Sequence, residues 1–80
     1  MDWLKKVLEI KQKLSDNGHT YIVNKITDAQ MVLGTPGEMY LEVMGVLLDV
    51  KKNGGKELKL IHHDIEELLN YGRSINYFIG

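Results

Sequence analysis

Three glycine-containing breaks divide this chain of 80 residues, at positions 16–18, 34–37 and 53–55. Each break follows a run of helical length in which apolar side chains recur at the spacing of one helix face. Glycine or asparagine after such a run ends a helix readily, because either residue adopts the left-handed backbone conformation at little cost. The only proline, Pro36, stands at the start of a run, where a helix tolerates it. The breaks therefore predict four helices joined by short loops.

The size of the chain limits it to one hydrophobic core, because 80 residues with 44% apolar side chains cannot surround two. We expect a single helical domain over residues 1–80. Short loops make successive helices antiparallel, so the predicted fold is all-α, a compact antiparallel four-helix bundle. The expected helices lie near residues 2–16, 20–33, 36–53 and 56–74.

The first and third segments carry the clearest helical signals. Leu4 and Leu8 widen an apolar face of the first segment that consists of Trp3, Val7, Ile10 and Leu14. The third segment opens with Thr35, Pro36 and Glu38, which have the spacing of a capping box with proline at the first helical position. Its remainder is apolar around most of the helix. We expect it to be the central helix, covered by several neighbours or partly by a partner protein.

The second segment has two interpretations. Residues 19–23 are rich in β-branched and aromatic side chains and follow Asn-Gly, which favours a strand. Ile22, Ile26, Ala29 and Leu33 recur at helical spacing, however, and no alternating strand precedes them. We predict a helix with Thr20 as its N-cap.

The last segment continues an apolar helix face to its end. Leu58, Ile61, Ile65 and Leu68 form this face. Beyond Gly72 the same spacing extends through Ile75 and Ile79. Residues 72–80 therefore either prolong the helix or pack on the core as an apolar tail.

Charge and cysteine content narrow the possible partners and location. Ten Lys and Arg residues against eleven Asp and Glu residues give a net charge of −1, which disfavours DNA, RNA and anionic membranes as partners. No apolar stretch has the length of a membrane span or the form of a signal peptide. The chain has no cysteine, which fits a reducing compartment. We expect a cytoplasmic protein.

Common catalytic and cofactor motifs do not occur in the sequence. Residues 54–57 lack the first glycine and the hydroxyl residue of a P-loop, and GxGxxG, GxSxG and HExxH patterns are missing. We therefore expect no cofactor and no catalytic residue.

A cluster of histidines and carboxylates supports an alternative. His62 with Glu66, and His63 with Glu67, are spaced four residues apart, so each pair could give a metal ion two ligands on a helix. A complete site needs carboxylates from another helix. The alternative function is thus a metal-binding or acid-base enzyme centred on these four residues. The simpler interpretation leaves both glutamates and His63 in solvent, with His62 at the edge of the apolar face.

Residues typical of interfaces suggest a surface for a protein partner. These candidates are Met31, Tyr71, Arg73, Tyr77 and Phe78. The leading hypothesis is a noncatalytic interaction module, an adaptor or inhibitor that binds another protein or a second copy of itself. A bacterial immunity or antitoxin-type protein is one version, although such partners usually have strongly complementary charge.

Overall fold

The computed structural model describes residues 2–32 and 34–75. In chain order the helices are α1 (Trp3–Asp16), α2 (Thr20–Gln30), α3 (Pro36–Asn53) and α4 (Lys56–Ser74). The described part of the chain contains no strand, and the predicted all-α four-helix bundle is confirmed.

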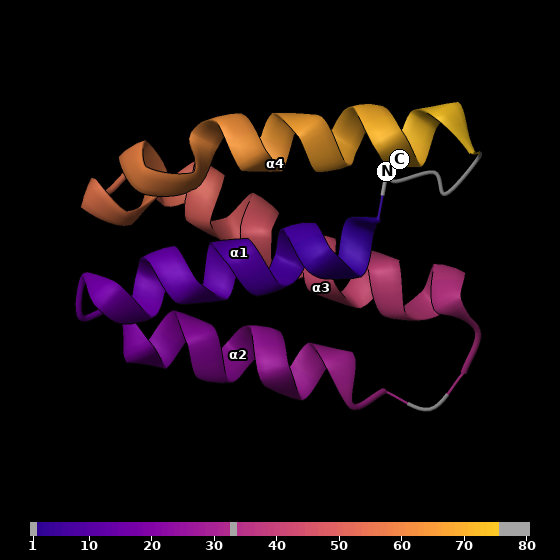
Figure 1. Cartoon of the computed structure of the whole chain (residues 1–80), viewed down its shortest axis with the longest axis horizontal. Helices are drawn as coiled ribbons and strands as arrows, with labels where there is room; N and C mark the ends of the chain where they lie inside the picture. The colour runs from indigo at the N-terminus through magenta and orange to yellow at the C-terminus, as the bar shows by residue number, and fades with distance from the viewer. Residues whose placement is uncertain (1, 33, 76–80) are drawn as a thin grey trace.

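The helices pack in a ring in which each contacts two others (Figure 1). Helix α1 lies beside α2 and α4, and α3 lies beside the same two helices, so α1 and α3 face each other across the bundle. The expectation that residues 36–53 form a central helix is therefore wrong. Helix α3 occupies one corner, and its polar stripe, which includes Glu38, Glu42 and Asp49, is exposed at the surface.

The core draws on all four helices, and one aromatic contact crosses it. The Trp3 and Tyr40 rings meet edge to face with their centroids 5.5 Å apart, which joins α1 to α3. Tyr40 is fully buried, and its hydroxyl donates a hydrogen bond of 2.6 Å to the carbonyl oxygen of Leu68. The other buried apolar residues are Val7, Ile10, Leu14, Ile22, Ile26, Ala29, Val43, Met44, Leu47, Val50, Ile61, Ile65 and Leu68.

Local capping interactions explain where α1 and α3 begin. The Asp2 side chain accepts a hydrogen bond of 3.2 Å from the backbone nitrogen of Lys5, so Asp2 precedes α1 as its N-cap. The Thr35 hydroxyl accepts one of 3.2 Å from the backbone nitrogen of Glu38, as the capping-box spacing predicts. Helix α3 ends at Asn53, and its C-cap is Gly54, whose φ of 64° is the left-handed conformation that glycine favours.

Helix α2 differs from the prediction at both ends. Thr20 is the first helical residue, and His19 is the N-cap without a side-chain cap bond, so the expectation that Thr20 caps this helix is wrong. The helix ends at Gln30, before the predicted end at residue 33. The Met31 nitrogen bonds to the Asp28 carbonyl oxygen at 3.1 Å, a three-residue bond that tightens the last turn. The strand alternative for residues 19–23 is wrong, because helix α2 includes residues 20–23.

Helix α4 matches its predicted bounds and ends at Ser74, with Ile75 as its C-cap. Gly72 is part of the helix and is buried. The expectation for the rest of 72–80 concerns residues 76–80, which lie outside the described residues.

Candidate functional site

Asp64 is the one buried charged residue in the described part of the chain, with 3% of its surface exposed. It lies on α4, in the flank that faces α1. Ionised carboxylates are rarely buried without partners, because transfer out of water is costly.

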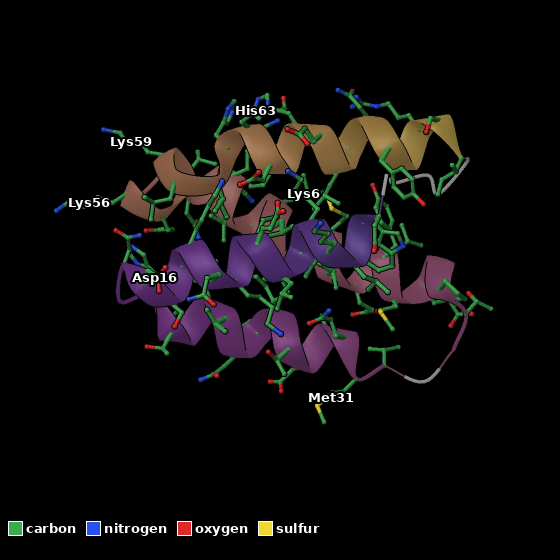
Figure 2. All side chains as sticks on the ribbon, viewed as in Figure 1. Lys6, Asp16, Met31, Lys56, Lys59 and His63 are labelled. Atoms are coloured by element: carbon green, nitrogen blue, oxygen red, sulfur yellow. The ribbon has the colours of Figure 1, made fainter. Side chains whose placement is uncertain are left out.

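Two lysines of α1 neutralise this carboxylate. Lys6 Nζ lies 3.3 Å from Asp64 Oδ1, and Lys13 Nζ lies 2.6 Å from Asp64 Oδ2. The two lysines are two helical turns apart, so both project from the same flank of α1. Figure 2 shows Lys6 between α1 and α4. The three residues form an ionic seam between these helices.

Lys6 extends the seam along α4. Its Nζ atom also lies 3.1 Å from Glu67 Oε2 and 3.4 Å from Glu9 Oε2. Its hydrogen bond to Glu67, with further help from Asp64 and Glu9, raises the pKa of Lys6 against the opposing effect of burial. Lys6 is therefore a protonated cation at neutral pH, a form that is neither a nucleophile nor a general base.

The four residues of the predicted metal cluster have different partners. His63 Nε2 lies 2.7 Å from Glu67 Oε1, and the His63 side chain is 87% exposed (Figure 2). Glu66 Oε2 lies 3.4 Å from Lys51 Nζ of α3. His62 is exposed, and its position falls outside the buried face of α4. Within residues 2–32 and 34–75, no three His, Asp or Glu side chains are grouped so that they could hold a metal ion.

The three predicted interface residues that the structure describes, Met31, Tyr71 and Arg73, do not form one patch. Met31 is 73% exposed and projects from the end of α2 (Figure 2). Tyr71 of α4 is half-buried and packs against the core, whereas Arg73 is exposed and donates to Asn70 Oδ1 at 3.2 Å. Helices α2 and α4 lie on opposite sides of the bundle and do not pack against each other. The remaining candidates, Tyr77 and Phe78, lie outside the described residues.

Sequence reasoning assigned two exposed leucines of α1 to the core. Leu4 is 46% exposed and Leu8 is 63% exposed, so they do not widen the buried face as expected. They lie one turn apart at the flank of the helix, where 3.6-residue spacing alone does not separate a core edge from solvent. Other large apolar side chains that the structure leaves exposed are Tyr21, Met31, Leu41 and Ile75.

A small pocket of about 70 Å³ opens where α2, α3 and the start of α4 meet. Its apolar residues are Ile22, Val46 and Val50. Its polar and aromatic residues are Tyr21, Lys25, Asp49, Asn53 and Glu57. We call this the α2–α3 pocket. Sequence reasoning missed it, because its residues come from three segments and no motif connects them.

Comparisons of the chain with protein-family models, curated proteins and solved structures found no match. In the described part of the chain, every helix is too short or too polar to cross a membrane.

Proposed function

We propose that this chain is a noncatalytic protein-interaction module, an adaptor or inhibitor that acts by covering or bridging a partner. The observation that carries the proposal is the exposure of Leu4 and Leu8, 46% and 63% respectively, side by side on α1. An isolated exposed leucine is ordinary on a protein surface. Two leucines one turn apart give a partner a continuous apolar contact along one helix.

The ionic seam supports a binding role more than a chemical one. Both oxygens of Asp64 are engaged by lysines, and Lys6 is held in its protonated form. These groups fix α4 against α1, so the exposed leucines stand on a helix whose position is constrained. A rigid helix presents side chains to a partner with little loss of conformational entropy on binding.

The proposed partner is a protein, either another chain or a second copy of this one. The net charge of −1 gives little attraction to nucleic acid. We place the interaction in the cytoplasm, in keeping with the lack of cysteine. An immunity or antitoxin-type inhibitor is one form that such a module takes.

Site-specific photo-crosslinking tests the proposal. A benzophenone amino acid is placed at Leu8 and, as a matched exposed polar control on α3, at Glu42. We expect irradiation in cells to give a defined adduct from position 8 and none from position 42. The adduct is identified by mass spectrometry, and the purified partner is then combined with the purified chain. Identical adduct patterns from both positions, or no binding between the purified proteins, would contradict the proposal.

A further inference from the structure

We propose that the α2–α3 pocket receives an arginine side chain of a protein partner. The inference rests on the proposed interaction function and adds the chemistry of the group that is recognised. The size of the pocket, its apolar floor and the charges at its rim all support this assignment.

The size of the pocket suits the end of a side chain. Its volume of about 70 Å³ is around half that of the ~150 Å³ engineered cavity that holds benzene. Pockets for drug-sized ligands span roughly 300–1,000 Å³. A nucleotide or a whole cofactor is therefore too large, whereas part of one side chain fits.

The floor offers contact to an aliphatic stem. Ile22, Val46 and Val50 bring apolar side chains from α2 and α3 to the pocket. Long cationic side chains pack their methylene groups on such surfaces while the charged head group stays near water.

The rim favours a positive charge. The Asp49 and Glu57 side chains line the pocket, and neither forms an ion pair with any other described residue. Lys25 also lines the pocket and forms no ion pair with a described residue. The residues that line the pocket therefore carry two negative charges and one positive charge. The surplus is one negative charge, which a partner's cation would balance.

The aromatic ring at the rim favours arginine over lysine. Tyr21 is 57% exposed and lines the same pocket. A guanidinium group stacks on an aromatic face and presents several N–H donors in one plane, so it can meet both carboxylates. A lysine ammonium lacks the planar face.

Methyl NMR titration of the full chain with N-acetyl-arginine N-methylamide tests the inference. We expect saturable shifts of the Ile22, Val46 and Val50 methyl signals, with a dissociation constant of about 1–20 mM for so small a probe. The equivalent blocked norvaline and blocked glutamate serve as neutral and acidic comparison probes. Neither should shift these signals saturably in the same range.

Charge variants decide whether the carboxylates recognise the probe. Asp49→Asn with Glu57→Gln should weaken arginine binding by about threefold or more, and Lys25→Gln should tighten it by about twofold. Glu42→Gln, on the exposed stripe of α3, should change nothing. The inference is overturned if the acidic or neutral probe binds as well as arginine, if Lys25→Gln weakens binding, or if no saturable shift occurs.

The NMR titration and the crosslinking experiment fail independently. If arginine does not bind but Leu8 crosslinks to a partner, the pocket inference alone is wrong. If arginine binds the isolated chain but the crosslinked contacts are nonspecific, the proposed function is wrong and the pocket remains a cation site.

Discussion

At the scale of single residues, Asp64 shows how a buried charge can be accommodated in a small bundle. Its two carboxylate oxygens are divided between Lys6 and Lys13, so neither oxygen is left without a partner. No buried side-chain nitrogen or oxygen among the described residues lacks a hydrogen-bond partner. Removing one member of such a group is costly mainly because the remaining charges lose their counter-charge. The seam is therefore sensitive to single substitutions.

Replacing Asp64 with asparagine should destabilise the fold more than the equivalent change at a surface pair. Asp64→Asn leaves Lys6 without its buried counter-charge, and we expect a loss of about 2 kcal/mol, less than for a fully buried pair because Lys13 is half-exposed. Glu66→Gln, which breaks the exposed pair with Lys51, should cost less than about 0.5 kcal/mol. Urea denaturation measures both, and equal losses would contradict the structural role assigned to Asp64.

Tyr40 should make stability fall at alkaline pH. Burial raises the pKa of its hydroxyl above the ordinary value of 10.0, so the folded chain retains a proton that the unfolded chain releases. Its contribution to stability is complete below pH 10 and is lost as pH rises toward the folded-state pKa. Lys6 acts in the same direction, because its pKa is raised from 10.5.

The variant Tyr40→Phe separates the two effects. At pH 8 it should be less stable by about 1 kcal/mol, because the hydrogen bond to the buried Leu68 carbonyl is lost. Above pH 10 this difference should shrink, because only the natural chain has a hydroxyl to ionise at this position. Denaturation curves from pH 8 to 11 test this, and a difference that stays constant or grows would count against a raised pKa for Tyr40.

The histidines and glutamates of α4 should not take up metal. Glu66 and Glu67 are engaged by lysines, and His62 and His63 are exposed without a third ligand among the described residues. After chelator treatment, excess Zn²⁺ should shift the melting temperature by less than about 1 °C, because a metal that binds only the folded state raises it by mass action. A clear rise would revive the metal-enzyme alternative.

At the scale of helices, the sequence features that predicted helix ends correctly are local ones. The capping residues before Glu38 and the left-handed Gly54 place both ends of α3 where the sequence indicates. The end of α2 was missed because Leu33 continues the apolar spacing, whereas backbone bonding at Met31 ends the helix three residues earlier. The spacing of apolar residues indicates which face of a helix is buried. It does not determine the residue at which the helix ends, which depends on the chain that follows.

The candidate site was less predictable than the helices, because it depends on which helices become neighbours. Asp64 lies within a charged run, and its lysine partners are 58 and 51 residues away along the chain. Only the packing of α1 against α4 brings them together. The same holds for the α2–α3 pocket, which three segments build, and for Leu4 and Leu8, whose exposure depends on how α1 is oriented against its neighbours.

Two glycines at α3 should respond in opposite directions to alanine. Gly45 lies inside the helix and is exposed, and a methyl group added to it would meet nothing within 4 Å besides its two chain neighbours and the helix's own backbone. Gly45→Ala should therefore raise stability by about 0.5–1 kcal/mol through helix propensity. Gly54→Ala should lower it by about 1 kcal/mol, because its φ of 64° is strained for a side chain. Thermal melting measures both, and a loss at Gly45 would indicate a contact that the structure does not contain.

At the scale of the whole molecule, the bundle separates what stabilises the chain from what a partner can reach. The ring of helices buries one apolar core, the seam locks α1 to α4, and Leu4 and Leu8 remain outside. Substituting these leucines should therefore leave the fold intact. Residues of an interaction surface can be substituted without loss of the fold, whereas residues at the edge of the core cannot.

The affinity of the crosslinked partner for a Leu4→Gln, Leu8→Gln double variant tests the central claim most directly. Fully burying an exposed leucine contributes about 1.5–3 kcal/mol, and each of these leucines is about half-exposed, so we expect the loss of both to weaken binding by at least about tenfold. The melting temperature should stay within about 3 °C of the natural chain, since exposed positions contribute little to stability. Unchanged affinity, or a loss of binding that follows unfolding of the variant, would contradict the claim that these leucines form the interaction surface.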